Sequence, residues 1–380
     1  MSNYFDVLVF SFYPPAYIAG GPVRSIEAII EYTGNDVKYL VYSKDKFNSC
    51  SDKINFDYNL NNPRILTYEH LSLIGMFKLM RKYHFKYIYL NSFFSFNQVL
   101  YSVVCSWIFG VKIVISIRGQ IEDGAMLNSS KKKIYIFFFR IFFKNSISKF
   151  HSTSISETSN ISKKLKVSSD KIIQISNLRK IITSHVLPFS LKTSDNCFKF
   201  VFYSRIVPKK NLLHLLNLLY SSNLKSVRLD IYGNIEDVSY WQKCLKVIQE
   251  NEHNKSIMVT YRGIIDDTNL YEVLSQYYVF IFPTLSENFG HVIIEALMSG
   301  IPILVNDTTP FSNDIIKYNI GHVIDFNDSI AFYSALKSYI NMNKEDYLSI
   351  KKRILIYLKD LEDNNIFISR NYIKLFKHEK

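Results

Sequence analysis

The sequence predicts an α/β fold made of two tandem, doubly wound parallel-sheet domains. Short runs of β-branched and aromatic residues alternate with helix-length segments along nearly the whole chain, which is typical of parallel sheets covered by helices. A polar stretch, LPFSLKTSDN (Leu187–Asn196), interrupts this alternation once, and we interpret it as a linker. At 380 residues the chain is also long enough for two domains of ordinary size.

The first domain is expected to span residues 1–190 and to begin with a strand. Helix-length segments such as Ser25–Tyr32 and Phe96–Ile108 separate its strands. The strands themselves are expected at Asp6–Phe10, Val37–Tyr42, Tyr87–Leu90, Val111–Ile117 and His151–Ser156.

The second domain is expected to span residues 197–360, and a C-terminal helix near residues 362–380 is expected to pack back on the first domain. Its strands are near-continuous apolar runs, as expected for strands buried on both faces. They are Phe198–Ser204, Arg228–Gly233, Ile257–Gly263, Val279–Pro283, Ile301–Asn306 and Gly321–Asp325. Both domains are therefore Rossmann-like and are expected to face a cleft, with ligands bound beyond the carboxyl ends of the strands.

The composition is that of a globular protein with an anionic partner. Hydrophobic residues make up 48% of the chain and charged residues 21%. The net charge of +13 favours nucleic acid, an acidic membrane surface or phosphorylated small molecules. Because the basic residues are dispersed and no nucleic-acid-binding module is recognisable, we expect no nucleic-acid partner.

No pattern of export or of a membrane span is recognisable. The N-terminus lacks the basic region and the long apolar run of a signal peptide. The apolar stretch Val99–Ile117 contains Trp107, Gly110 and Lys112, so it is better divided into a helix and a strand. We expect a cytoplasmic protein, and peripheral attachment to the inner face of the cytoplasmic membrane stays open. The cysteines lack metal-binding spacing and are expected to be reduced thiols: Cys50, Cys105, Cys197 and Cys244.

One segment bears on that attachment. KKKIYIFFFRIFFKNSISKFH (Lys131–His151) interleaves six basic residues with a dense aromatic run. A basic amphipathic helix of this kind can lie in the interface of an anionic membrane. A helix that packs its aromatic side on the core and exposes its basic side is the alternative.

Two loops at predicted strand ends carry residues suited to phosphate. Gly20 and Gly21 follow the first strand and precede a helix, so their backbone can approach a phosphate closely. There is no G-x-G-x-x-G, and a tight turn without a ligand stays an alternative. Arg205 and Lys210 follow the first strand of the second domain, and two cations at this place suit a diphosphate. A solvated basic loop without a ligand is the alternative, which their position makes the weaker one.

The stretch PTLSENFGHVIIEALMSGIP places two glutamates eight residues apart. A helix is expected at His291–Ser299 with Gly290 at its N-terminus, so Glu287 lies before this end and Glu295 about one turn inside. A carboxylate accepts hydrogen bonds from two vicinal hydroxyls at once. The pair therefore predicts a site for a ligand with a sugar on each side of a phosphate. The alternative is a helix-start charge at Glu287 and a surface residue at Glu295.

The same stretch resembles the signature of the retaining GT-B glycosyltransferases of family 4, also called glycosyl transferases group 1. The signature has the form P-S-x-x-E-x-F-G-x-x-x-x-E-A-M-x-x-G-x-P-V, and its glutamates fall on Glu287 and Glu295. The family's G-R-L-x-x-x-K-G element is similar to SRIVPKKN, which contains Arg205 and Lys210. IRGQIEDGAML and NDTTPF further resemble segments of a bacterial surface-polysaccharide subgroup.

Some positions depart from the family's pattern. Asn288 replaces a common glycine and His291 a small apolar residue. Arg118 stands where many relatives keep a histidine near the donor sugar, and the N-G-V/I turn retains only Asn177. These departures leave the identity of the sugar open.

The resemblance implies transfer of a sugar, with retention, from a UDP- or GDP-sugar to a glycan or lipid-linked acceptor in capsule, O-antigen or other surface-polysaccharide synthesis. Glu287 is implied to hold the donor sugar's hydroxyls and Glu295 those of the ribose. Arg205 and Lys210 are implied to neutralise the leaving diphosphate. The implied catalytic residues are thus Glu287, Arg205 and Lys210, and the other donor-binding residues are Gly20, Gly21, Arg118, Asn288, Phe289, Gly290, His291, Val292, Glu295 and Thr309.

The implied mechanism is front-face attack with the leaving phosphate as base, and no metal is expected because cations and a helix end supply the charge. No D-x-D motif follows a strand, and Asp266-Asp267 is interpreted as a helix-start cap. A GT-B nucleotide-sugar epimerase or a non-catalytic, nucleotide-sugar-binding relative is the alternative.

Overall fold

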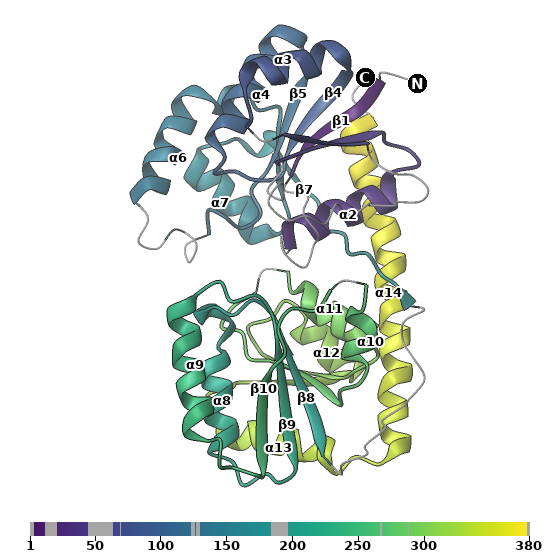
Figure 1. The fold of residues 1–380 in the computed structure, drawn as a ribbon. Helices are drawn as coiled ribbons and strands as arrows, with labels where there is room; N and C mark the ends of the chain where they lie inside the picture. The colour runs from purple at the N-terminus through teal and green to yellow at the C-terminus, as the bar shows by residue number, and fades with distance from the viewer. Residues whose placement is uncertain are drawn as a thin grey trace. The chain divides into compact units, whose positions relative to one another are not determined.

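The computed structural model describes residues 4–11, 21–44, 64–68, 70–122, 126, 130–183, 197–266, 268–287 and 289–377 (Figure 1). The expected linker Leu187–Asn196 and Cys50 lie outside these residues. The chain divides into two compact units, Met1–Lys180 with Asn364–Lys380 and Ile181–Asp363. This division falls ahead of the expected linker.

The first unit is built on a seven-stranded parallel sheet with the order β3-β2-β1-β4-β5-β6-β7. The registers place Val9 of β1 between Val41 of β2 and Tyr89 of β4. Its strands are β1 (Tyr4–Phe10), β2 (Tyr39–Lys44), β3 (Arg64–Tyr68), β4 (His84–Leu90), β5 (Lys112–Ser116), β6 (Lys149–Ser152) and β7 (Ile172–Gln174).

Helices cover both faces of this sheet, as the apolar faces of a parallel sheet require. One face packs on α3, α4, α6 and α7, and the other on α2 and the end of α14 (Figure 1). These helices are α2 (Gly21–Thr33), α3 (Leu73–Lys82), α4 (Phe96–Phe109), α6 (Ser130–Phe142), α7 (Ile155–Leu165) and α14 (Lys344–Lys377), with 3-10 turns η1 (Lys144–Ser146) and η2 (Ser169–Lys171).

The strand expected at His151–Ser156 is wrong in its second half. β6 ends at Ser152, and α7 begins at Ile155. The hydroxyl of Ser154 accepts the Glu157 backbone N–H at 3.1 Å, and the Glu157 carboxylate accepts the Thr153 N–H at 2.6 Å. These two contacts start a helix where the β-branched pattern continues. The short strands β3 and β7 were not expected from the sequence.

The second unit is built on a six-stranded parallel sheet with the order β10-β9-β8-β11-β12-β13. Phe200 and Phe202 of β8 pack with α8, α9 and α13, whereas Val201 and Tyr203 pack with α10, α11, α12 and α14. The strands are β8 (Phe198–Tyr203), β9 (Val227–Tyr232), β10 (Ile257–Tyr261), β11 (Val279–Phe282), β12 (Ile303–Asn306) and β13 (Gly321–Ile324). The helices are η4 (Pro208–Lys210), α8 (Leu212–Tyr220), α9 (Val238–Glu250), α10 (Leu270–Leu274), α11 (His291–Met298), α12 (Ser312–Tyr318) and α13 (Ser329–Ile340).

The helix α14 takes part in both units. It is one continuous helix of 34 residues. Ile350 and Tyr357 near its start are buried in a core of the second unit. Tyr372, Leu375 and Phe376 near its end are buried against the first sheet, with α2 on the same face. The first unit therefore completes its core with residues from the far end of the chain.

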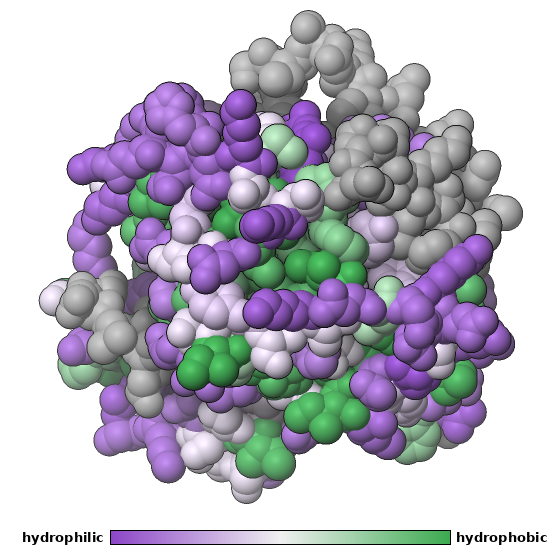
Figure 2. Space-filling view, turned by 90° about the horizontal axis from the view of Figure 1, so that it is seen from below, coloured by the Kyte–Doolittle hydropathy of each residue, from purple (hydrophilic) through white to green (hydrophobic). Residues whose placement is uncertain are grey.

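The described surface is mixed in character. On the face in Figure 2, separate hydrophobic patches lie among hydrophilic residues. Within the described ranges, no helix is both long enough and apolar enough to cross a membrane.

Phe376→Ala is predicted to destabilise the protein. The ring is 1% exposed and lies between the rings of Tyr39, Tyr87 and Tyr89, at centroid distances of 6.1, 5.8 and 5.8 Å. Its removal should lower the free energy of unfolding in urea by about 3–5 kcal/mol. Phe367→Ala is the matched control, because Phe367 lies on the same helix but is 65% exposed, and it should change stability by less than about 0.5 kcal/mol. Equal effects of the two changes would contradict the packing of α14 on the first sheet.

Candidate active site

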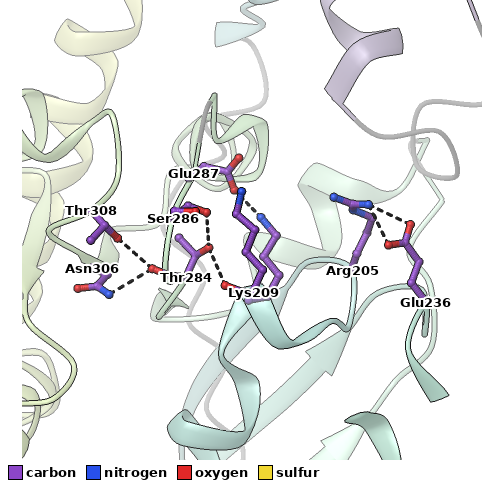
Figure 3. A network of polar contacts seen from close by, with 9 residues as sticks. Arg205, Lys209, Glu236, Thr284, Ser286, Glu287, Asn306 and Thr308 are labelled. Carbon is purple, nitrogen blue, oxygen red and sulfur yellow. Dashed lines mark hydrogen bonds and ion pairs between the residues drawn. The ribbon is translucent and has the colours of Figure 1, made fainter. Parts of the chain in front are cut away.

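The candidate site lies at the carboxyl edge of the second sheet, between β8 and β11. The strand order reverses at this point, and ligands of open α/β sheets bind in such places. The turns after the two strands are hydrogen-bonded to each other, because the Lys209 carbonyl accepts the Leu285 N–H at 3.0 Å and the Thr284 hydroxyl at 3.2 Å (Figure 3). This pairing fixes the turn after β11 against η4.

A buried ion pair joins the same two turns. The Lys210 ammonium contacts the Glu287 carboxylate. The two side chains are only 8% and 16% exposed. The ammonium also lies 4.9 Å from the ring centroid of Phe282, the last residue of β11. Two of the predicted catalytic residues, 77 positions apart in the chain, are thus in direct contact.

Burial and neighbouring charges shift the pKa values of this pair in opposite directions. Burial acts to raise the pKa of Glu287, but Lys210, Lys209 and the hydrogen bond from the Gly290 backbone hold it below its usual value. Burial lowers the pKa of Lys210, and the attraction of Glu287 opposes that change. The carboxyl group is therefore held ionised at the helix end.

The helix α11 begins next to this pair. Gly290 is its N-terminal cap and has a left-handed backbone, with φ 63° and ψ 46°. A Cβ atom here would lie 3.1 Å from Phe311 and 3.3 Å from Cγ of Glu287, so only glycine fits without a shift. The backbone N–H groups at the start of α11 and the positive end of its dipole lie at this turn.

The remaining residues of the signature lie on this helix or just before it. Glu295 is 2% exposed, so the alternative of a surface residue at this position is wrong. A buried carboxylate is costly unless it is paired or hydrogen-bonded, which makes a purely incidental glutamate a poor explanation. The rings of Phe289 and His291 lie 4.3 Å apart between centroids, and His291 and Val292 are half-buried in the first turn.

Polar side chains at the end of the next strand support the turn after β11. Asn306 and Thr308 both donate to the carbonyl of Thr284, at 3.2 and 3.1 Å (Figure 3). Thr309 is buried, and its hydroxyl lies 3.2 Å from that of Ser312. Of these residues only Thr309 was a predicted site residue. The place of Asn306 at a strand end was the signal that could have indicated it.

The structure places Arg205 in a different contact from Lys210. Its Nη1 atom donates to both carboxylate oxygens of Glu236, at 3.0 and 2.9 Å (Figure 3). Both side chains are well exposed, at 52% and 40%. Glu236 lies in the turn after β9, and no sequence pattern pointed to this pair.

The predicted residues of the first unit are described on their own. Gly21 is the first residue of α2. Gly20, like Asn288 of the second unit, lies outside the described residues. Arg118 follows β5 and donates to Asn91, Asn177 and the Tyr89 hydroxyl. Among the described residues, no group of three or more His, Cys, Asp or Glu side chains has the geometry to hold a metal ion.

A comparison with protein families found a match within the second unit. Residues 186–354 match the family described as Glycosyl transferases group 1. This part of the chain is therefore similar to a group 1 glycosyltransferase domain. This domain contains Arg205, Lys210, Glu287 and Glu295, so both halves of the site at β8 and β11 lie within the match.

Two curated relatives each match part of this chain. The first is the UDP-N-acetylglucosamine–peptide N-acetylglucosaminyltransferase GtfA subunit of Streptococcus agalactiae, 28% identical over 33% of this chain and 24% of that protein. The second is an uncharacterized 41.2 kDa protein in the cps region of Klebsiella pneumoniae, 24% identical over 52% of this chain and 53% of that protein. The chain thus matches about a quarter and about half of the length of these relatives.

The fold is that of known GT-B glycosyltransferase structures. One such structure is HepE of Anabaena in complex with UDP and glucose, with a TM-score of 0.67 and 12% sequence identity. The match covers 99% of this chain and 100% of the HepE chain. The expected α/β fold with two parallel-sheet units is confirmed.

Glu287→Gln is predicted to destabilise the protein in a pH-dependent way. The change leaves Lys210 buried without its opposite charge, which typically costs about 3–5 kcal/mol. The folded pKa of Glu287 lies below its usual value of 4.5. The stability that the carboxylate contributes is therefore complete above that usual value and is lost as the pH falls through the folded pKa. The difference from wild type in urea unfolding should therefore be largest near neutral pH and shrink in acid.

Glu236→Gln is the control for this measurement. It also breaks an ion pair, but the pair with Arg205 is exposed, so the cost should stay below about 1 kcal/mol. A Glu287→Gln effect that is as small as this, or that does not change with pH, would contradict a buried ion pair.

Proposed function

We propose that this protein is a retaining, metal-independent glycosyltransferase. It transfers a sugar from a UDP- or GDP-sugar to a glycan or lipid-linked acceptor in the synthesis of a capsule, an O-antigen or another surface polysaccharide. The observation that carries the proposal is the buried Lys210–Glu287 pair beside the N-terminus of α11. The group 1 domain supports the reaction class, and the relative in the cps region of Klebsiella pneumoniae supports the pathway.

The pair has the two chemical properties that a nucleotide-sugar site needs. Glu287 is ionised, and its carboxylate can accept hydrogen bonds from two hydroxyls of the donor sugar. The Lys210 ammonium and the N–H groups at the start of α11 supply positive charge for the diphosphate. Arg205 adds a guanidinium, which must leave Glu236 to reach a phosphate; that exposed pair costs little to break.

The other donor contacts follow from the same turn. The buried Glu295 carboxylate is assigned to the ribose hydroxyls, one turn along α11 from the phosphate end. Asn288, Phe289, Gly290, His291 and Val292 are assigned to the sugar and phosphates, and Thr309 to the edge of the pocket. Gly20, Gly21 and Arg118 of the first unit complete the proposed donor-binding set.

In the proposed reaction the protein stabilises the leaving group and supplies no nucleophile of its own. Breaking the bond between the sugar and the phosphate builds positive charge on the sugar and negative charge on the diphosphate. Fixed cations aimed at the diphosphate lower that barrier, which is the usual main contribution of electrostatics to catalysis. The acceptor hydroxyl attacks from the face that the diphosphate leaves, and its proton passes to the leaving phosphate. On this proposal Glu287 orients the sugar and forms no covalent bond.

A transferase assay with a panel of UDP- and GDP-sugars and glycan acceptors tests the reaction. Glu287→Gln should lower kcat at least about 100-fold, because the sugar loses its orienting contact. Glu272→Gln, an exposed glutamate on α10, should leave kcat within about twofold. Turnover should persist in EDTA, and NMR of the product should show the donor's anomeric configuration.

The outcomes separate the alternatives. A change of the nucleotide sugar in the absence of any acceptor would indicate an epimerase. Binding without turnover across the panel would indicate a non-catalytic relative. Inversion of configuration, or loss of turnover in EDTA, would overturn the corresponding part of the proposal.

A membrane surface is the proposed second partner, through the helix α6. The helix has two apolar sides, because Ile136 and Phe139 are buried in the core while a second row is exposed. The exposed row follows helical spacing and is called the outer face of α6: Ile134, Phe137, Phe138, Ile141 and Phe142, between 48% and 60% exposed. The buried side agrees with the interpretation as a core-facing helix, and the exposed side supports the proposed contact with a membrane.

Basic residues flank this outer face. Lys131 and Lys133 are exposed at the start of α6, and Arg140 and Lys144 lie in and after its last turns. Bulky apolar side chains with cations beside them match the interface of an anionic bilayer. Placement there would bring the enzyme to a lipid-linked acceptor.

Co-sedimentation with liposomes tests this partner. Wild-type protein should bind vesicles that contain anionic lipid more strongly than neutral vesicles, and added salt should weaken the binding. A variant with Phe137→Ser, Phe138→Ser and Phe142→Ser should lose most of the binding. The control variant, Ile316→Ser with Ile330→Ser, removes exposed apolar side chains of the second unit and should bind as wild type does. Equal binding to anionic and neutral vesicles, or no binding, would count against the proposal.

A further inference from the structure

The strand β10 forms one edge of the second sheet. It pairs with β9, and within the described ranges no strand lies on its other side (Figure 1). Its five residues, Ile257–Tyr261, read IMVTY and include neither a charged residue nor a proline. Charged residues and prolines are the usual means by which edge strands avoid pairing with another chain. The sequence of β10 therefore leaves this edge open to a further strand.

The backbone groups of β10 point alternately toward β9 and away from it. The Ser256 carbonyl accepts the Val227 N–H at 3.0 Å, and the Arg262 N–H donates to the Ile231 carbonyl at 2.8 Å. Since every second residue of a strand faces the same neighbour, the even-numbered residues of β10 also face β9. The residues that turn their backbone groups outward are the odd-numbered ones: Ile257, Val259 and Tyr261.

Most of these outward groups have no partner in the part of the chain that the structure describes. The Ile257 N–H donates to the Asn254 side-chain oxygen at 3.2 Å. The N–H groups of Val259 and Tyr261 make no hydrogen bond to the described residues, nor do the carbonyls of all three outward residues. A strand that added to this edge would supply a partner for each of them.

Apolar side chains flank the same edge on both faces of the sheet. On one face Val259 and Tyr261 are half-buried, and the ring of Tyr261 lies 4.9 Å from that of Trp241 on α9, between centroids. On the other face Met258 is 47% exposed. A further strand would cover part of this apolar surface, so burial would add to the backbone hydrogen bonds.

We propose that two copies of this chain associate by antiparallel pairing of β10 with β10 of the second copy. With Val259 opposite Val259 of the second copy, Ile257 lies opposite Tyr261. Every outward residue then meets an outward residue, as the hydrogen-bonded pairs of an antiparallel ladder require. The contact is its own mirror under a twofold axis, which is the commonest symmetry of homo-oligomers.

The charges beside β10 are compatible with a second copy. Lys255 and Arg262 flank the strand, and both are exposed. In the proposed register Lys255 lies opposite Gly263 of the second copy, and Arg262 lies opposite Ser256. No cation therefore faces a cation, a pairing that would be destabilising. The association goes beyond the proposed transfer reaction and is measured without donor or acceptor.

Sedimentation velocity of the full chain tests the association. Wild-type protein should shift from monomer to dimer as its concentration is raised to the order of 100 µM. Because the net charge of +13 makes the two copies repel each other, added salt should shift the equilibrium toward the dimer. A chain that stays monomeric over these concentrations, with and without added salt, would overturn the proposal.

A proline variant connects the dimer to β10. Val259→Pro removes an N–H that points away from β9, so it spares the hydrogen bonds within the sheet and should weaken dimerisation at least about tenfold. Val323→Pro is the matched control on β13, the opposite edge strand. There the Ile324 carbonyl accepts the Asp307 N–H at 3.2 Å, so Val323 also turns outward. This control should dimerise as wild type does, and equal dimerisation of the two variants would overturn the proposal.

A cysteine variant tests the register and does not depend on the proline being tolerated. Val259→Cys places two cysteines opposite each other with a Cα separation of about 5.5 Å, which is within the range of disulfides. Mild oxidation should give a covalent dimer on a non-reducing gel, whereas Val323→Cys and wild type should stay monomeric. The native Cys105, Cys197 and Cys244 are buried and should contribute little background. Absence of the cross-link in Val259→Cys would overturn the proposed pairing.

Discussion

The geometry of the candidate site in the second unit depends on the buried ion pair between Lys210 and Glu287. Two opposite charges that are removed from water must stay together, because either one alone in this environment is strongly destabilising. The pair therefore holds the turns after β8 and β11 in one arrangement, and the Lys209 carbonyl reinforces it with two hydrogen bonds. The start of α11 is fixed by the same turn, so its N–H groups are already in place before a ligand arrives.

Both sheets place polar side chains at the point of their carboxyl edge where the strand order reverses, although the residues differ. Parallel strands all end at one edge, so the reversal of strand order brings two turns together there. In the second sheet an ammonium and a carboxylate meet at this point. In the first sheet the reversal is occupied by neutral groups, Ser11 and Asn91, and the charge of Arg118 comes from the adjacent strand. The ion pair in the second sheet neutralises its own charges, whereas the cluster in the first sheet keeps the positive charge of Arg118.

Local patterns in the sequence predicted what depends on local structure. The apolar runs predicted all six strands of the second sheet, and Gly290 before an apolar helix predicted the start of α11. The prediction failed at Ser154, where side-chain capping overrides a β-branched run. It also could not give the partners of Arg205 or Arg118, because Glu236 lies 31 residues away and Asn91 lies 27 away. Such partners are set by the order of strands in the sheet, which no short stretch of sequence encodes.

The division of α14 between the units has a consequence for synthesis of the chain. The α14 residues that share the cover of one face of the first sheet with α2, from Asn364 onward, are translated only after the whole of Ile181–Asp363. At typical elongation rates that interval is roughly 10–40 s. During it Val7, Val9 and Val41 lack part of their cover on the ribosome-bound chain. The nascent first unit therefore keeps part of this apolar face exposed until α14 is made, and it completes its core last although it is made first.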